Sequence, residues 1–164
     1  MTLTKQNVSL ALLRIAMGWL FLWAFVDKVF GLGFATAGDK SWLSGASPTT
    51  GFLSFGVKGP FSDLFHALAG NPFVDWMFML GLLGIGIAFV FGIAIRLASY
   101  AGMAMMFLMW LALLFPANNP FLDEHIIYLL VFYFFSTQSD AGDTFGFGEK
   151  WQRLHIVKKW KWLS

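Results

Sequence analysis

Residues 76–122 decide the fold of this chain. They read WMFMLGLLGIGIAFVFGIAIRLASYAGMAMMFLMWLALLFPANNPFL, and Arg96 is the one charged residue among them. A helix that crosses the roughly 30 Å of hydrocarbon in a bilayer needs about 20 apolar residues, and each side of Arg96 offers such a run. A soluble fold would have to bury both runs on all sides, which a chain of this length hardly achieves. The stretch therefore predicts two membrane-spanning helices.

The composition of the whole chain agrees with a membrane protein, because 58% of its 164 residues are hydrophobic and only 12% are charged. We predict an all-α integral membrane protein in which four transmembrane helices form one domain, residues 1–164. The fourth span is short in its apolar core and would need neighbouring helices or a thinned bilayer. The predicted spans are 8–30, 73–95, 97–115 and 123–138, with an extended outer segment at 31–72 and a basic tail at 144–164.

The distribution of basic residues predicts the orientation, because Lys and Arg near span ends are retained in the cytoplasm. With the N-terminus inside, the inner side would hold Lys5, Arg14, Arg96, Lys150, Arg153, Lys158, Lys159 and Lys161, and the outer side Lys28, Lys40 and Lys58. We therefore expect a multi-pass protein with both termini in the cytoplasm.

The tail and the missing cysteines restrict the partners. A net charge of +2 gives no reason to expect nucleic acid, and Lys158–Lys161, interleaved with Trp160 and Trp162, is typical of an anchor to anionic lipid. The absence of cysteine excludes disulfides, cysteine-ligated iron–sulfur centres and c-type haem attachment. Redox chemistry would then need a quinone, a non-cysteine cofactor or another subunit.

No metal or haem site is expected either, because His66 and His125 show no repeated ligand spacing.

Two segments have structural interpretations. The outer segment is expected to be an interfacial cap with a short amphipathic helix at Ser62–Ala69, bracketed by Pro60 and Pro72, although a re-entrant segment is the alternative. Small residues of the second span would let another helix approach closely, as they do in lipid. These residues are Gly81, Gly84, Gly86, Ala88 and Gly92.

The densest polar cluster near the membrane is Asp123-Glu124-His125, which follows a turn rich in Asn and Pro. On a helix, His125, Tyr128 and Phe132 would share one face. The end of the first span and the start of the fourth belong to the same side, so we expect Asp27 and Lys28 to meet Asp123 and His125 there as the catalytic groups. Quinone would contact Trp23, Trp42, Tyr128 and Asn119. The alternative is an aromatic belt with salt-bridged helix ends.

Arg14 lies within the first span and needs a partner or must extend to the headgroups. Asp140 and Asp143 follow the fourth span on the same side. We expect a structural ion pair between Arg14 and one of these carboxylates, which would fasten the first helix to the last.

A set of short motifs resembles the DoxX/DoxD family of small four-helix membrane proteins, from about Ser9 to Trp151. The motifs are LRIAMGW at 13–19, Trp23 with Asp27-Lys28, GLLGIG at 81–86, the Arg96 turn, Asn118-Asn119-Pro120, DEHIIY at 123–128 and Ala141-Gly142-Asp143. Their order and spacing carry the resemblance more than any one of them.

The resemblance implies a membrane subunit of thiosulfate:quinone oxidoreductase, which oxidises thiosulfate to tetrathionate and reduces a quinone in the cell membrane of a prokaryote. It also implies a partner, a small DoxA-like subunit or another redox subunit; assembly of several copies is a further possibility. A non-catalytic DoxX-like scaffold that recruits a soluble redox enzyme is the alternative. A small-solute transporter is a third, although the broken-helix repeats typical of transporters are lacking.

Overall fold

The computed structural model describes residues 4–116, 119–138 and 140–160, and over these residues the chain is helical and contains no β-strand. Four longer helices form its body: α1 (Lys5–Phe30), α3 (Pro72–Phe91), α4 (Ile95–Ala112) and α5 (Glu124–Thr137). The shorter ones are η1 (Gly38–Lys40), η2 (Trp42–Ser44), η3 (Phe52–Gly56), α2 (Ser62–His66), α6 (Gly148–Gln152) and α7 (His155–Lys159). Asn118, Lys161 and Trp162 lie outside the described residues.

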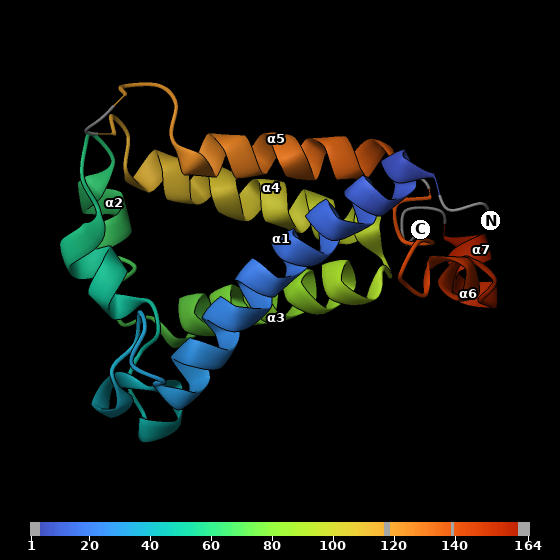
Figure 1. The fold of residues 1–164 in the computed structure, drawn as a ribbon. Helices are drawn as coiled ribbons and strands as arrows, with labels where there is room; N and C mark the ends of the chain where they lie inside the picture. Colours follow the sequence, from blue (N-terminus) through green and yellow to red (C-terminus); the bar gives the residue numbers. More distant parts are fainter. Residues whose placement is uncertain (1–3, 117–118, 139, 161–164) are drawn as a thin grey trace.

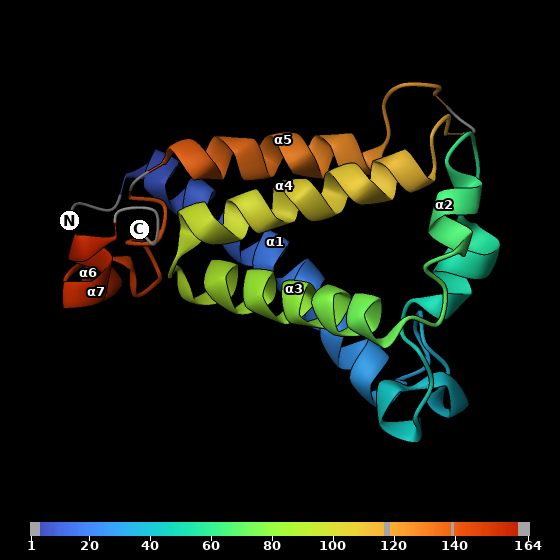
Figure 2. The same ribbon diagram turned by 180° about the vertical axis from the view of Figure 1, so that it is seen from behind.

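The long helices form two pairs. Helix α1 packs against α3, and α4 packs against α5; we call these pairs the α1–α3 arm and the α4–α5 arm. Figures 1 and 2 show that the arms meet at the end where α6 and α7 lie and diverge toward the opposite end, where α2 lies. We name these ends the α6–α7 end and the α2 end.

Three helices are long and apolar enough to cross a membrane by length and composition: α1, α3 and α4, with 26, 20 and 18 residues. Helix α5 is apolar but has only 14 residues, about 21 Å at 1.5 Å per residue, which falls short of a bilayer core. The all-helical class and three candidate spans are thus confirmed. The fourth span stays a prediction.

Local capping sets the helix ends. The Thr4 side chain accepts a hydrogen bond from the Asn7 amide at the start of α1, and Gly31 ends that helix in the left-handed conformation. Helix α3 ends in the same way at Gly92, with φ 71°, four residues before the predicted Arg96 turn. Arg96 accordingly lies in the first turn of α4.

The core between the arms is built on phenylalanine rings. Phe132 of α5 lies 5.3 Å from Phe21 of α1 and 5.1 Å from Phe89 of α3, measured between ring centroids. Gly102 of α4 lies so close to Phe132 that a Cβ there would meet its ring at 2.6 Å. Helices α1, α3 and α5 therefore contribute rings to one cluster of edge-on aromatic contacts, and α4 leaves space for it at Gly102.

The predicted ladder of small residues serves several purposes. A Cβ on Gly86 would lie 2.8 Å from the backbone nitrogen of Leu22 in α1, and one on Gly18 would lie 2.6 Å from that of Val90 in α3. The close approach of α1 and α3 thus depends on both glycines, as expected for helices that pack in lipid. Gly81 instead makes room for Met105 of α4.

The outer segment is attached to both arms. Near the α1–α3 arm, the buried carboxylate of Asp75 accepts hydrogen bonds from the Ser47 and Thr49 hydroxyls. At the α4–α5 arm, the Lys58 amide donates to the Ala112 carbonyl at 3.0 Å. A second apolar cluster of Leu53, Val57, Phe65 and Ala112 strengthens this contact. The predicted helix at Ser62–Ala69 corresponds to α2, which ends three residues earlier, at His66.

Substitution of Gly86 by Ala should lower the free energy of unfolding by about 1–3 kcal/mol, because the new methyl group would meet the backbone of Leu22. Gly84→Ala is the matched control on the same helix, since a Cβ there meets nothing within 4 Å. Thermal unfolding in one detergent compares the two variants. Equal stability of the two would contradict the close helix crossing.

Single cysteines test the orientation on a chain that contains none of its own. Lys40→Cys and Lys159→Cys place a thiol at an exposed position of the outer segment and of α7, respectively. In intact cells a membrane-impermeant maleimide should label only the Lys40→Cys variant, because basic residues concentrate at the α6–α7 end. Labelling of only the Lys159→Cys variant would reverse the predicted topology.

Candidate functional site

Asp123 and His125 form a buried pair at the start of α5. One carboxylate oxygen of Asp123 accepts the His125 and Ile126 amides at 3.0 and 3.3 Å and so caps the helix. The other lies 2.8 Å from Nδ1 of His125, and the two side chains are only 9% and 11% exposed. We assign the Nδ1 proton to this bond, which leaves Nε2 to exchange a proton with a ligand.

The predicted helix face is present. His125 and Phe132 are buried, and Tyr128 packs against the same core cluster. The other histidines, His66 and His155, are exposed. Of the three histidines, His125 is therefore the buried one, and a carboxylate orients its imidazole.

Asp123, Glu124 and His125 also bring three ligand atoms within 4.8 Å of one another. Their proximity follows from their order in the chain, and Asp123 already accepts hydrogen bonds from its own helix. Glu124 is exposed. We infer no metal site from this group, since its geometry is that of a helix cap.

Asp27 and Lys28 are engaged by the outer segment. Asp27 is 1% exposed, and its carboxylate accepts the amides of Phe34 and Ala35 at 3.3 and 3.0 Å. The Lys28 ammonium donates to the Pro48 carbonyl at 3.3 Å and lies 5.8 Å from the centroid of the Phe78 ring. Both residues hold the loops that follow α1.

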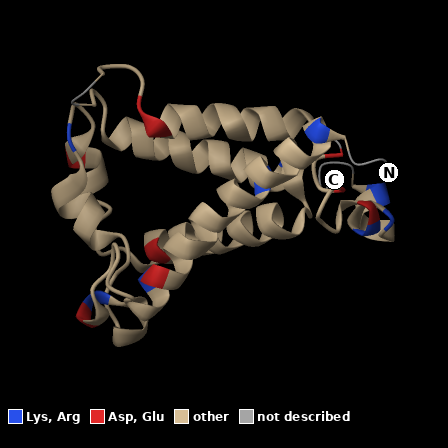
Figure 3. Ribbon diagram, viewed as in Figure 1, with Lys and Arg blue, Asp and Glu red and all other residues tan. Residues whose placement is uncertain are grey.

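The structure does not bring these two pairs together. The C-terminal end of α1 and the N-terminal end of α5 lie on different arms, where the arms are furthest apart (Figures 1 and 2). Figure 3 shows acidic residues on each arm near the α2 end. The site predicted from sequence is thus divided into an Asp123–His125 part and an Asp27–Lys28 part.

The residues that were predicted to contact quinone are likewise divided between the two parts of the site. Trp23 packs against Trp19 and Phe34, with ring centroids at 5.9 and 5.1 Å. Trp42 meets Trp76 edge-on at 4.7 Å. Of the predicted aromatic walls, only Tyr128 shares a helix with His125.

Asn119 has a local role. Its side-chain oxygen accepts the Phe121 and Leu122 amides at 3.0 and 3.2 Å. This is the geometry of an Asx turn, so the side chain organises the loop before α5.

Arg14 is completely buried, at 0% exposure. Its guanidinium donates to the carbonyl oxygens of Gly142, Thr144 and Phe145 at 3.1, 3.2 and 3.0 Å. Among the described residues, no ion pair joins it to the predicted carboxylates of Asp140 or Asp143. The predicted attachment of the first helix to the segment after α5 exists, but backbone carbonyls provide it.

Glycines explain why carbonyls can surround this side chain. A Cβ on Gly92 would overlap Nη1 of Arg14, and one on Gly146 would lie 2.5 Å from the same atom. Asp143 is close enough for its charge to act on Arg14 without touching it. Burial, followed by the charges of Glu149 and Asp140, raises the pKa of the Asp143 carboxyl, and the charge of Arg14 opposes this.

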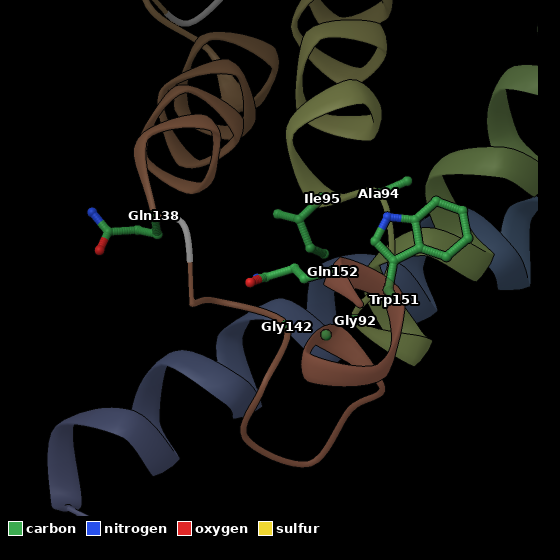
Figure 4. A pocket seen from close by; sticks show the side chains of 8 residues that line it. Gly92, Ala94, Ile95, Gln138, Gly142, Trp151 and Gln152 are labelled. Carbon is green, nitrogen blue, oxygen red and sulfur yellow. The ribbon is translucent and has the colours of Figure 1, made fainter. Parts of the chain in front are cut away.

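A small cavity lies beside this region (Figure 4). Its volume of about 10 Å³ leaves room for about one water molecule. The cavity is therefore too small for a quinone or a sulfur oxyanion. Its lining comes from the α3–α4 turn, the end of α5 and α6: Gly92, Ala94, Ile95, Gln138, Gly142, Gly148, Trp151 and Gln152.

An apolar groove of about 400 Å³ lies between α1 and α5. Every lining side chain is aliphatic or aromatic: Leu10, Leu13, Ile127, Leu130, Val131 and Phe134. Because polar groups are lacking from this lining, the groove suits a hydrocarbon chain and not a polar headgroup.

Sequence reasoning missed Asp75. This residue is 7% exposed and binds two hydroxyls of the outer segment. The available signal was an acidic residue in the first turn after the Asn71-Pro72 helix start. Its partners Ser47 and Thr49 lie in irregular chain, which no helical pattern predicts.

Comparisons with protein-family models, curated proteins and solved structures found no match to this chain. The resemblance to the DoxX/DoxD family therefore stays a prediction that rests on the motifs alone.

Replacement of Arg14 by Met should destabilise the protein by about 3 kcal/mol or more, because its hydrogen bonds to three carbonyls are lost and two of these bonds are buried. Arg153→Met is the control, since that side chain is 77% exposed and its ion pair with Glu149 lies on the surface. Unfolding in detergent measures both. If Arg14→Met lowers the free energy of unfolding no more than Arg153→Met does, the anchoring role of Arg14 is contradicted.

Proposed function

We propose that this chain is the membrane subunit of a quinone-linked oxidoreductase that oxidises thiosulfate to tetrathionate. The observation that carries the proposal is the buried Asp123–His125 pair, 2.8 Å apart, with Tyr128 on the same helix face. A histidine can act as a general acid or base, and here the carboxylate of Asp123 orients its ring.

The reaction balances in two halves. Two thiosulfate ions join through a new sulfur–sulfur bond to give tetrathionate and release two electrons, and a quinone takes up these electrons with two protons to give a quinol. In this proposal, protonated His125 gives one proton from Nε2 to a quinone oxygen, and water at the membrane surface gives the second. Asp123 accepts the hydrogen bond from Nδ1 throughout and keeps the ring in position.

Two surfaces support this assignment. The apolar groove between α1 and α5 includes Ile127, two residues from His125, and offers a hydrocarbon surface to the isoprenoid tail of a quinone. Three lysines at the α2 end, Lys28, Lys40 and Lys58, would attract a sulfur oxyanion by their charge. Because the chain has no cysteine, thiosulfate must react with the bound quinone or with a centre on a small DoxA-like partner.

The second candidate is a non-catalytic scaffold. Helix α6, helix α7 and the turn between them carry exposed basic side chains that would attract an acidic soluble redox enzyme. These are Lys150, Arg153, Lys158 and Lys159. Under this alternative the Asp123–His125 pair only caps α5.

Membranes that contain this chain and its small partner should reduce a quinone analogue when thiosulfate is added. His125→Ala should lower this rate on the order of 100-fold or more, because general acid catalysis contributes at that scale. Asp123→Asn should also slow the reaction while α5 stays folded, since Asn caps helices as well as Asp.

His66→Ala and His155→Ala are the matched controls, because both histidines are exposed; these variants should keep the wild-type rate. The amount of folded protein is measured in parallel for every variant. Absence of thiosulfate-dependent reduction, together with loss of a bound soluble enzyme when the basic residues of α6 and α7 are neutralised, would establish the scaffold instead.

A further inference from the structure

We propose that α6 and α7 form a binding surface for the headgroups of anionic phospholipids. This α6–α7 surface consists of the basic residues Lys150, Arg153, Lys158 and Lys159 with the apolar residues Phe147, Leu154, Ile156 and Trp160. All eight side chains are exposed. The proposal does not depend on the proposed oxidoreductase function, because it concerns the opposite end of the bundle from Asp123 and His125.

The charge of the surface is complementary to an acidic headgroup. Residues 148–160 contain four basic residues against one acidic residue, Glu149. Glu149 lies 3.5 Å from Arg153, and the Lys150 ammonium lies 5.4 Å from the centroid of the Phe147 ring. Asp140 and Asp143 precede the surface, while Lys158 and Lys159 follow one another in the last turn of α7.

The apolar side chains distinguish a lipid from a purely ionic partner. Phe147, Leu154, Ile156 and Trp160 are 49%, 46%, 57% and 50% exposed. Basic groups interleaved with large apolar groups are typical of segments that lie in the bilayer interface. There the lysines meet phosphate while the apolar groups enter the acyl boundary, so one partner satisfies both kinds of side chain.

The position of the surface agrees with this partner. Figures 1 and 2 show α6 and α7 at the end where α1 and α4 begin and α3 and α5 end. The Phe147 amide donates to the Phe91 carbonyl at 2.8 Å, and the Gly148 amide donates to the Gly142 carbonyl at 3.1 Å. With Arg14 bound to the preceding residues, the surface is held beside helix ends that would emerge from the bilayer.

A lipid titration of the full chain tests the proposal. The protein in detergent is titrated with phosphatidylglycerol or phosphatidylcholine, and bound lipid is counted by native mass spectrometry. Wild type should prefer phosphatidylglycerol. The double variant Lys158→Gln/Lys159→Gln should lose affinity for it on the order of 10-fold to 30-fold, because each basic residue near an anionic surface contributes about a fivefold factor.

Lys40→Gln/Lys58→Gln is the matched control, since it removes the same charge from exposed lysines at the α2 end and should leave the affinity for phosphatidylglycerol unchanged. Thermal unfolding checks that both double variants are folded. Equal binding of the two lipids by wild type, or equal losses in the two double variants, would overturn the proposal. Undiminished phosphatidylglycerol binding by Lys158→Gln/Lys159→Gln would overturn it as well.

Discussion

The hydrogen bonds of Arg14 are the interaction on which the arrangement of this chain depends. A guanidinium within an apolar helix is costly unless its donors find acceptors, and here three carbonyls from residues 142–145 accept hydrogen bonds from its Nη1 and Nη2. The same contact fixes the segment after α5 against α1 and against the end of α3. The Gly92 turn and the position of the segment that leads into α6 depend on this set of bonds.

Much of the helical layout could be predicted from sequence, because hydrophobic runs and capping residues act locally. The Pro72 start and the Phe30 end were predicted to within a residue. The end of α3 was not, since Gly92 stops this helix in the left-handed conformation and makes room for Arg14 by its lack of a Cβ. Leu113–Phe115 were assigned to a span by their hydropathy, but they lie beyond the last turn of α4.

In the candidate site, contacts between neighbouring residues could be predicted from sequence, but contacts between distant segments could not. The Asp123–His125 contact follows from adjacency and a helix start, and the sequence indicated both. The predicted contact between Asp27 and His125 assumed that helix ends on one side of a membrane also lie next to one another. The arms diverge, so the end of α1 and the start of α5 are far apart. Asp75 and the carbonyl partners of Arg14 belong to irregular chain, where contacts depend on tertiary structure and leave no periodic pattern.

The distance in sequence between Arg14 and its acceptors has a consequence for biogenesis. A ribosome makes α1 before residues 142–145, so the Arg14 guanidinium is made more than a hundred residues before its acceptors exist. Until then the first helix must stay shallow enough for Arg14 to reach headgroups or water. Synthesis of residues 142–145 would then let α1 reach its final depth, so the placement of this helix depends on a segment that is made more than a hundred residues later.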